Sequence, residues 1–363
     1  MGGNLTQIKM QTNKIQINSH FYHLAEIQQK VKNKARQEWE KNIFEFILQW
    51  FDSSDYIVQH TSGSTGSPKA IQLKKSAMVA SAQKTIKFFN LKKDDTTWLC
   101  LPINYIAGKM MVVRALTGKL NLVLTPPEGT PTIPDQNINF ASMVPLQVQK
   151  LIDTNFNFAS IEKLIIGGAP VDYKLYQAIQ QISTEIYATY GMTETCSHIA
   201  LQRINGPNPD NAFKTMDGVT ISSDNNNCLQ IKVSGITSKI LTTTDMVEIV
   251  SPFEFKWLGR ADNVINTGGI KVFPEILEKE ISEIIHKECV IVPQADPLLG
   301  QKVVLVIEGK EEELPTKTIL NQIEEKVEKH QKPKAVYYLN CFPRNQSMKT
   351  DRQKIKQLLE SKQ

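Results

Sequence analysis

The sequence predicts an α/β protein with a large N-terminal α/β domain, a small antiparallel β part and a small C-terminal α+β domain. Apolar segments alternate with helix-length segments through the first half of the chain, which is typical of βαβ units and a mostly parallel, buried sheet. Within 219–250 apolar residues alternate singly with polar ones, as in a small antiparallel sheet or barrel. The expected strands of the parallel sheet are 97–101, 120–124, 139–144, 164–166 and 185–188.

The N-terminal region is expected to contain helical segments and one short strand. Residues 1–19 are polar and expected to be loosely ordered, whereas 21–51 has a helical pattern. The apolar run 56–58 is interpreted as a short buried strand, and an amphipathic helix follows it. The apolar faces of the two helical segments comprise Trp39, Ile43, Ile47 and Trp50, and then Met78, Ala82, Ile86 and Phe89.

The segment 259–271 is a predicted boundary, which divides the chain into domains 1–259 and 260–363. A domain of about a hundred residues is an ordinary size. Pro274 is expected at the first turn of a helix, where its missing N–H costs nothing. A second helix and three strands, at 290–292, 303–307 and 336–339, complete this domain. The first helix has Leu277, Ile281, Ile284 and Ile285 on one face, and the second carries Ile319, Leu320, Ile323 and Val327.

Composition excludes several classes of protein. Hydrophobic residues make up 41% of the 363 and charged residues 22%, which is ordinary for a globular protein. The net charge is +5, and acidic and apolar residues interrupt the lysine-rich stretches, so these are interpreted as solvated helix faces that bind no nucleic acid. Five widely spaced cysteines argue against a disulfide or zinc framework. No apolar stretch approaches the ~20 residues of a membrane span. We therefore expect a cytoplasmic protein.

The stretch 61–69 is rich in hydroxyl residues and glycine and follows the apolar run directly. Glycine lets backbone N–H groups turn toward an anion, and hydroxyl and ammonium groups add donors that a polyphosphate needs. Ser67 and Pro68 separate the last glycine from the lysine, so this is not a Walker A loop. A flexible Ser/Gly surface loop is the alternative. The expected phosphate-binding residues are Thr61, Ser62, Gly63, Ser64, Thr65, Gly66 and Lys69.

Two further stretches follow predicted strands. In 190–194, Glu194 is a natural magnesium ligand beside a triphosphate, Thr193 can donate to phosphate, and Tyr190 can stack on a base. The alternative is a turn with a solvated glutamate. Gly167 and Gly168 end another strand, where a simple strand-to-helix turn is equally compatible with the pattern.

These stretches resemble, in order, the signature motifs of the adenylate-forming superfamily of acyl-CoA synthetases, peptide-synthetase adenylation domains and luciferases. The resemblance runs from His60 to Arg352. It implies a shortened version of that family's fold, because the family normally carries a long N-terminal subdomain before the phosphate loop. The 21–51 region is expected to cover what that part would cover. The implied nucleotide-binding residues beyond the phosphate loop are Gly167, Gly168, Ala169, Tyr190, Gly191, Met192, Asp245 and Arg260.

The resemblance also implies a moving C-terminal domain. Asp262 would be the hinge, and Gly268, Gly269 and Lys271 would form the loop that serves the CoA step. Lys349 aligns with the family's catalytic lysine, whose ammonium stabilises the charge built up when carboxylate meets α-phosphate. With Thr193 and Glu194 it completes the implied catalytic set. The sequence departs from the family at Thr244 and Met348, where glycine is usual.

Within the superfamily the chain is most similar to o-succinylbenzoate–CoA ligases of menaquinone biosynthesis, on the stretches 60–66, 101–108, 112–114 and 190–198. That acid has two carboxylates, and the one that is not activated needs a counter-charge. Tyr105 stands at the family's acyl-pocket position. Lys109, Arg114, His198 and Arg203 are unranked candidates for the second carboxylate, and for His198 an ordinary satisfied histidine is the equal alternative.

The expected activity is ATP-dependent formation of an acyl-adenylate, with Mg²⁺ at Glu194, followed by transfer of the acyl group to CoA. Another aryl or medium-chain acid is the first alternative. A non-catalytic relative that binds nucleotide or acyl-adenylate is the second. The expected partners are small molecules, and a homodimer is the possible assembly.

Overall fold

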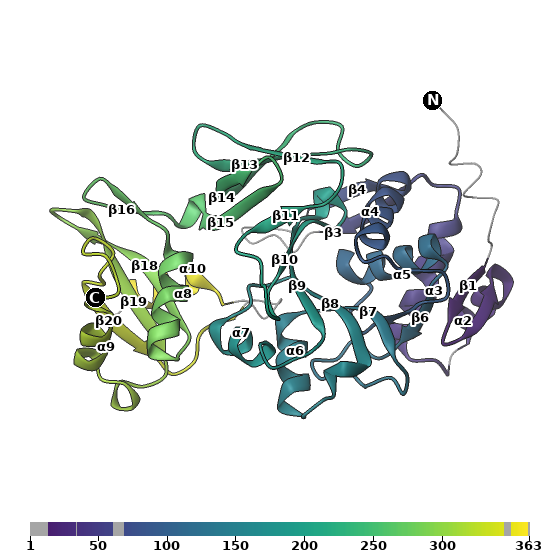
Figure 1. Ribbon diagram of the computed structural model, residues 1–363, viewed down its shortest axis with the longest axis horizontal. Coiled ribbons are helices and arrows are strands. Elements are labelled where there is room, and N and C mark those ends of the chain that lie inside the picture. Colours follow the sequence, from purple (N-terminus) through teal and green to yellow (C-terminus); the bar gives the residue numbers. More distant parts are fainter. Residues whose placement is uncertain (1–13, 34, 61–68, 345–349, 362–363) are drawn as a thin grey trace. The chain divides into compact units, whose positions relative to one another are not determined.

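The computed structural model describes residues 14–33, 35–60, 69–344 and 350–361 (Figure 1). The chain forms two compact units. Unit 1 comprises Met1–Val171, Ala178–Thr220 and Ile231–Leu241, and unit 2 comprises Asp172–Gln177, Ile221–Gln230 and Thr242–Gln363. The domain division at 259 stays a prediction. In the part of the chain that is described, no helix is long and apolar enough to cross a bilayer.

A mostly parallel sheet forms the centre of unit 1, as predicted. Its strands β6 (Asn121–Leu124), β5 (Thr96–Leu99), β7 (Ile138–Met143), β8 (Ile161–Ile166) and β9 (Glu185–Gly191) are neighbours in that order and pair in parallel. Most side chains of β5, β6, β7 and β8 are buried, which explains the continuous apolar runs in the sequence, whereas β9 buries Ile186 and leaves its other side chains partly exposed. The antiparallel strands β10 (His198–Arg203) and β11 (Phe213–Thr215) extend the sheet beyond β9.

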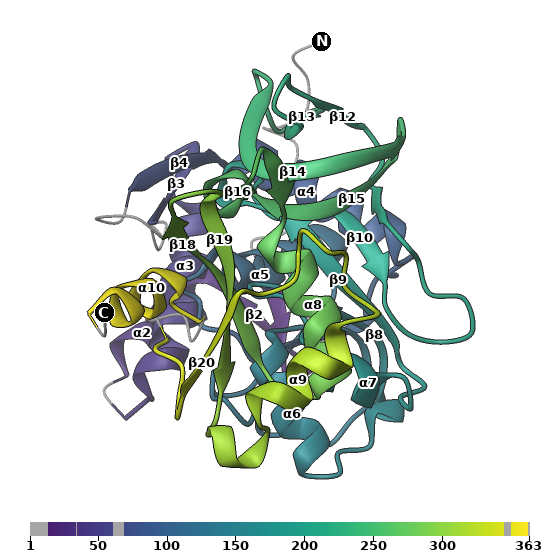
Figure 2. The ribbon, with the colours of Figure 1, turned by 90° about the vertical axis from the view of Figure 1, so that its left-hand side faces the viewer.

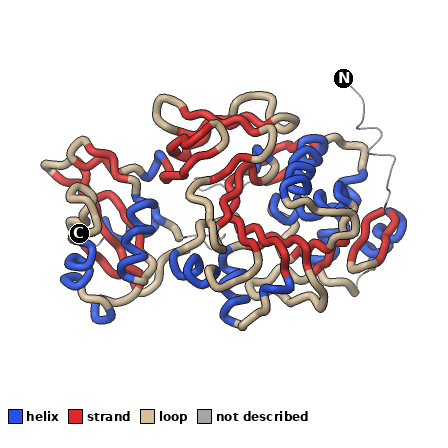
Figure 3. The backbone as a smooth tube through the Cα atoms, in the orientation of Figure 1, coloured by secondary structure: helices blue, strands red, loops and turns tan. Residues whose placement is uncertain are grey.

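Helices lie along this sheet (Figure 3). The predicted amphipathic helix is α4 (Lys75–Phe88), which buries Met78 and Ala82 and packs against α5 (Ile106–Gly118). Helix α5 in turn contacts β5 and β6. Two shorter helices, α6 (Pro145–Asp153) and α7 (Tyr173–Ile179), and the 3-10 turn η1 (Phe158–Ser160) connect the later strands.

The first residues of the described chain form a hairpin, which the sequence analysis did not predict. Strand β1 (Lys14–Ile17) pairs in parallel with β6, and β2 (His20–His23) pairs back on β1. Asn18 and Ser19 both adopt left-handed backbone angles, φ 48° and 66°, which suits a two-residue hairpin turn. The expected loose order through residue 19 was therefore wrong for 14–19, and the expected helix at 21–23 is strand.

Two helices follow the hairpin, α2 (Leu24–Lys32) and α3 (Glu38–Phe51). Helix α3 buries Ile43 and Ile47, as predicted. Trp39 and Trp50 are only partly buried, because Phe44 and Phe46 take the remaining core positions of this helix. Lys75 fixes the end of α3, since its ammonium contacts the carbonyl oxygen of Gln49 at 2.9 Å and the carboxylate of Asp52 at 2.7 Å.

The strand predicted at 56–58 is half-buried and lies outside the large sheet. Strand β3 (Tyr56–His60) pairs only with β4 (Ala70–Lys74), in an antiparallel two-stranded sheet. Ile57 is buried, whereas Tyr56 and Val58 on the opposite face are 40% and 42% exposed. A two-stranded hairpin covers the core with one face only, so the apolar run does not indicate burial on both sides.

The alternating segment forms strands in the order β12 (Val219–Ser223), β13 (Cys228–Val233), β14 (Leu241–Ser251) and β15 (Glu254–Arg260). Leu229, Ile231 and Val233 are buried, which confirms the predicted alternation. Strands β14 and β15 pair antiparallel. The turn η3 (Ala261–Asn263) follows β15 directly.

The C-terminal part of unit 2 is a small sheet with helices on both faces (Figure 2). Strands β18 (Cys289–Asp296) and β19 (Gly300–Glu308) form an antiparallel pair, and β20 (Ala335–Leu339) joins β19 in parallel. Helices α8 (Pro274–Ile285) and α9 (Thr316–Ile323), both predicted, pack on one face, and α10 (Arg352–Glu360), which was not predicted, packs on the other. Leu320 was expected on the apolar face of the second helix but is 38% exposed. The remaining elements are β16 (Ile265–Thr267), β17 (Ile270–Val272) and the turn η4 (Glu311–Glu313).

Candidate active site

The predicted motif 190–194 forms a rigid corner between β9 and β10. Strand β9 ends at Gly191, and the turn η2 (Thr193–Thr195) follows. The buried hydroxyl of Thr195 lies 3.1 Å from the backbone nitrogen of Met192 and 2.7 Å from the carbonyl oxygen of Ser197, which closes the corner. A Cβ at Gly191 would lie 2.4 Å from that carbonyl oxygen, so only glycine fits there.

The three side chains predicted to act at this corner differ in exposure and in surroundings. Glu194 is exposed, Thr193 is half-buried, and the ring of Tyr190 lies 5.9 Å from that of Phe213. Among the described residues no three His, Cys, Asp or Glu side chains are grouped as a metal site. Magnesium needs only one or two carboxylates when phosphate oxygens and water supply its other ligands. Exposed Glu194 on a fixed turn fits that requirement.

The glycine pair at the end of β8 lies beside this corner. Strands β8 and β9 are parallel neighbours, so their carboxyl ends share one edge of the sheet. A Cβ at Gly167 would come within 2.3 Å of the Thr189 hydroxyl, and Gly168 has φ +84°. Both positions therefore require glycine. The structure brings Gly167, Gly168 and the adjoining Ala169 together with the Tyr190 stretch at the edge where α/β proteins bind ligands.

Arg114 lies at the centre of a buried polar cluster that draws on three separate segments of unit 1. Its side chain is on α5, is 1% exposed, and donates a hydrogen bond of 2.7 Å to the hydroxyl of Ser197. That hydroxyl lies 3.3 Å from Nδ1 of His198, whose Nε2 lies 3.1 Å from the Thr85 hydroxyl of α4. We call Arg114, Ser197, His198 and Thr85 the Arg114 cluster.

The positive charge of Arg114 is uncompensated within the described part of the chain. Among the described residues, which include every acidic residue of the chain, no carboxylate forms an ion pair with Arg114. Its Nε is buried without a partner there, and the ring of Phe140 lies 5.9 Å away. Burial lowers the pKa of Arg114 to about 9, so the group is still a cation at neutral pH. Burial, and then the charge of Arg114, hold the pKa of His198 well below 6.5.

The other basic candidates lie elsewhere. Lys109 projects from α5 toward β3 and donates to Oε1 of Gln59 at 2.9 Å, and burial lowers its pKa. Five residues along a helix turn about 140°, so Lys109 and Arg114 face different sides. Arg203 lies at the far end of β10 from His198, about 16 Å along the strand. The structure thus joins Arg114 with His198 and separates both from Lys109 and Arg203.

Lys109 borders a hollow of about 370 Å³ that also includes Phe46 and Gln49 of α3 and Asn104. Tyr105 is the residue before α5 and is 47% exposed. Close packing fixes the start of this helix, since a Cβ at Gly108 would lie 2.4 Å from the carbonyl oxygen of Pro102.

A second group of predicted residues lies in unit 2. Asp245 of β14 accepts a hydrogen bond of 3.2 Å from the indole of Trp257, and it pairs across the hairpin with Arg260. The guanidinium of Arg260 contacts the carboxylate of Asp262 at 3.1 Å in an exposed ion pair. Thr244, where the family has glycine, lies in β14 and is exposed. It is not among the described residues with left-handed backbone, so this position does not require glycine.

The predicted CoA-step loop is the tight turn between β16 and β17. Gly268 and Gly269 have φ 58° and 84°, angles that favour glycine. Lys271 follows on β17 and is exposed. The phosphate-loop residues 61–66 and Lys349 lie outside the described residues, while Lys69 is described and exposed just before β4.

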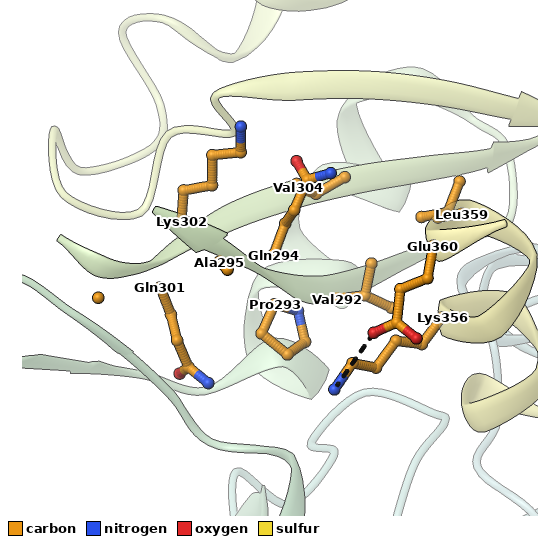
Figure 4. A pocket seen from close by; sticks show the side chains of 11 residues that line it. Val292, Pro293, Gln294, Ala295, Gln301, Lys302, Val304, Lys356, Leu359 and Glu360 are labelled. Carbon is orange, nitrogen blue, oxygen red and sulfur yellow. Dashed lines mark ion pairs between the residues drawn. The ribbon is translucent and has the colours of Figure 1, made fainter. Parts of the chain in front are cut away.

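A hollow of about 420 Å³ in unit 2 was not predicted (Figure 4). It lies between the end of α10 and strands β18 and β19, and Lys356 and Glu360 approach to 3.9 Å at its rim. Oε1 of Gln294 is buried there without a partner among the described residues. None of the predicted site residues lines this hollow.

Sequence analysis missed Ser197 and Thr85 of the Arg114 cluster. Ser197 lies within the 190–198 stretch, so its place in the motif was a usable signal. Thr85 lies 113 residues before His198 on an amphipathic helix, and nothing in its local sequence distinguishes it from other helix residues.

Comparisons with known proteins agree with this arrangement. A family model described as AMP-binding enzyme matches residues 6–229. A 2-succinylbenzoate–CoA ligase of Bacillus cytotoxicus is 26% identical over 84% of this chain and 70% of that relative. The crystal structure of an acyl-CoA synthetase (AMP-forming)/AMP-acid ligase II-like protein from Dyadobacter fermentans matches with a TM-score of 0.61 and 33% identity, over 91% of this chain and 97% of that one.

The o-succinylbenzoate CoA synthetase of Bacillus subtilis, solved with its acyl-adenylate intermediate, has a TM-score of 0.69 over 82% of this chain and 68% of its own. At 19% identity this likeness concerns the fold alone. The family match spans more than half of the chain, and the fold is that of the adenylate-forming enzymes. The chain therefore belongs to the AMP-binding enzyme family.

Proposed function

We propose that the protein is an AMP-forming acid–CoA ligase whose acid is o-succinylbenzoate, as in menaquinone biosynthesis. The family supports the nucleotide chemistry, and the name of the Bacillus cytotoxicus relative supports the acid. The single observation that carries the choice of acid is the uncompensated guanidinium of Arg114. Leaving a buried cation without an anion is costly, and a substrate with a second carboxylate would remove that cost.

The reaction has two steps. A carboxylate oxygen of the acid attacks the α-phosphorus of ATP, an O–P bond forms, and pyrophosphate leaves. The sulfur of CoA then attacks the acyl carbon, a C–S bond forms, the thiol proton passes to solvent, and AMP leaves. Both steps depend mainly on positioning and electrostatic stabilisation, so no covalent enzyme intermediate is needed.

Most of the predicted nucleotide-binding and catalytic residues have a role in this proposal. The 61–66 stretch and Lys69 hold the phosphates, and Gly167 and Gly168 form the adenine slot. Asp245 binds the ribose, and Arg260 reaches the ribose or a phosphate. Magnesium held by Glu194 would neutralise charge on the phosphates. Lys349 stabilises the first transition state, and rotation at Asp262 exchanges it for the Gly268–Gly269 turn before the CoA step.

The Arg114 cluster would bind the ring carboxylate. Arg114 supplies the positive charge and Ser197 a hydroxyl donor. His198 is neutral at physiological pH because its pKa is held low, so it adds a hydrogen-bonding group without a second buried charge. The cytoplasm, which holds ATP and CoA, is the proposed compartment, and a homodimer stays a prediction.

A pyrophosphate-release screen tests the proposal. We expect o-succinylbenzoate to be turned over faster than its ring-carboxylate methyl ester, benzoate or medium-chain acids. Faster turnover of a monocarboxylic acid would replace the proposed substrate, and calorimetric binding of ATP without turnover of any acid would identify a non-catalytic relative. As a control for the chemistry, Lys349→Ala should abolish adenylation while sparing thioester formation from preformed adenylate.

A further inference from the structure

The CoA-step loop lies at the tip of a short hairpin in unit 2 that is anchored at its base. Strands β16 and β17 pair antiparallel, and Ile265 and Val272 at the open end are buried in the core that α8 and α9 cover. Among the described strands, β16 joins β19 at a single residue pair, Thr267 and Gly300. The place of the loop therefore depends on the contacts near this pair.

The turn that joins β18 to β19, residues 297–299, supplies these contacts. We call it the β18–β19 turn. The carbonyl oxygen of Leu299 accepts a hydrogen bond of 2.9 Å from the N–H of Gly268. A Cβ at Gly268 would lie 3.3 Å from Cδ2 of Leu299, so the two residues also pack together. Just after the turn, Oε1 of Gln301 accepts a hydrogen bond of 2.9 Å from the N–H of Asn266.

The carboxylate of Asp296 fixes the β18–β19 turn. Its Oδ1 accepts from the N–H of Leu299 at 2.9 Å and from that of Leu298 at 3.0 Å. An aspartate that binds the backbone two residues further on is a common turn-forming arrangement. These hydrogen bonds lower the pKa of Asp296, so the carboxylate is ionised at neutral pH. Hydrogen bonds to an ionised acceptor are roughly twice as strong as neutral ones.

Packing does little to hold the same turn. Leu298 is 95% exposed, and Pro297 is exposed as well, so the shape of the turn depends on the bonds to Asp296. Leu299 uses its two backbone groups for different partners, because its N–H binds Asp296 and its carbonyl oxygen binds Gly268. One residue thus connects the carboxylate to the CoA-step loop.

We propose that Asp296 is a positioning residue for the thioester-forming step, and that it sets the place of the CoA-step loop through the backbone of Leu299. The inference rests on the proposed function, in which this loop serves the second half-reaction. Asp296 touches no reacting atom in this scheme. Its effect on rate is nevertheless expected to be large, because a misplacement of about 1 Å caused by a distant residue can cost about a hundredfold.

The test measures the two half-reactions separately in Asp296→Ala. We expect the rate of thioester formation from CoA and preformed o-succinylbenzoyl-adenylate to fall between about tenfold and a hundredfold. Adenylation, followed by pyrophosphate release without CoA, should stay within about twofold of the wild type, because that step does not use the CoA-step loop. Asp296→Asn should retain most of the thioester-forming rate, since an asparagine carbonyl oxygen can accept the same two hydrogen bonds. Gln301→Ala, which removes the bond to Asn266, should give a smaller fall in the same step.

The matched control is Asp95→Ala. Asp95 is half-buried, as Asp296 is, and its carboxylate accepts from the backbone N–H of Lys92 at 2.7 Å, but it belongs to a turn of unit 1. This variant should leave both half-reactions unchanged. Hydrogen exchange at the Gly268 amide, which needs no activity, should accelerate in Asp296→Ala and not in Asp296→Asn or Asp95→Ala.

Three results overturn the inference: unchanged thioester formation in Asp296→Ala, an equal fall in both half-reactions, or unchanged exchange at the Gly268 amide. A wild type that forms no adenylate from any acid instead overturns the proposed function, and with it the role assigned to the CoA-step loop. The exchange measurement would then still decide whether Asp296 holds that loop in place.

Discussion

Arg114 of unit 1 and Arg352 of unit 2 are both largely buried, yet their surroundings differ. Arg352 forms a two-point ion pair with Glu278 and also donates to the carbonyl oxygen of Ile291 at 2.5 Å. Arg114 has a hydroxyl, a methionine sulfur at 3.5 Å and an aromatic face, but no carboxylate among the described residues. Burial by itself favours a lower pKa for each guanidinium, and it lowers the pKa of Arg114. At Arg352 the charge and the hydrogen bonds of Glu278 outweigh burial, so the pKa of Arg352 is raised.

In the proposed function, this difference separates a structural cation, Arg352, from a cation that a substrate carboxylate would neutralise, Arg114. The carboxylate that balances Arg352 is part of the chain, so that pair fixes α10 to α8 and β18. A buried cation without such a partner destabilises the protein on its own account, and it is retained where an incoming anion completes the pair. The two arginines should therefore respond oppositely to the same substitution.

The largest expected effect is on the stability of unit 2. Arg352→Met leaves Glu278 buried and unpaired, and its free energy of unfolding should fall by about 3–5 kcal/mol. Hydrogen exchange within β18 in increasing urea measures this change. The double variant Arg352→Met/Glu278→Leu should recover most of the loss. A single variant as stable as the wild type would mean that this pair does not hold α10.

Arg114→Met should show the opposite pattern. The free energy of unfolding should stay within about 1 kcal/mol or rise, because an uncompensated buried charge is removed. Turnover should suffer instead: kcat/KM for o-succinylbenzoate should fall about a hundredfold, with little change for its ring-carboxylate methyl ester.

Arg203→Met is the matched control for that measurement. Arg203 was a candidate for the same role but lies at the other end of β10. Equal losses on the acid and its methyl ester in Arg114→Met, or a selective loss in Arg203→Met, would contradict the assignment.

The pH dependence of unit 1 sharpens the comparison further. His198 has a pKa well below 6.5 in the folded protein, mainly through burial and secondly through the charge of Arg114. The unfolded chain therefore binds the extra proton as pH falls below about 6.5, and stability should decline by about 1.4 kcal/mol per pH unit. His198→Gln should remove this slope, and the same slope in both proteins would exclude His198 as its source.

The smallest expected effect concerns the outer member of the Arg114 cluster. Thr85→Val removes the hydroxyl that lies 3.1 Å from Nε2 of His198, which should cost about 1 kcal/mol in free energy of unfolding. Urea denaturation of unit 1 measures it. Ser81→Ala provides a control on the same helix, since Ser81 is also buried but lies outside the cluster.

Sequence reasoning predicted those parts of the fold in which local pattern and tertiary environment agree. The parallel strands are continuous apolar runs because both faces are covered, and Pro274 begins a helix where its geometry suits the first turn. The hairpin at 14–23 was missed because Asn18 and Ser19 are a weaker turn signal than a glycine pair. The run 56–58 lies in a strand, as predicted, but its burial was overestimated because alternation cannot be recognised in three residues.

The candidate site shows the same limit. Gly167 and Gly191 lie where a Cβ would clash with a neighbouring atom, and each could be recognised in the sequence because it belongs to a motif. That Arg114 is buried without an acidic partner depends on segments as distant as Phe140 and Ser197, and only the folded structure shows it. The sequence therefore named four basic candidates without ranking them.

The contacts of Glu275 limit how the predicted hinge can bend. The Asn263 side chain donates to Oε1 of Glu275 on α8 at 2.5 Å, and a Cβ at Gly259 would lie 2.3 Å from Oε2. Any turn taken after Asn263 would break the first contact, so the chain from Asn263 onward should travel with α8 as one piece. Between these two contacts lie Arg260, Ala261 and Asp262, so a rotation at the predicted hinge would turn about these three residues and would pull apart the ion pair between Arg260 and Asp262.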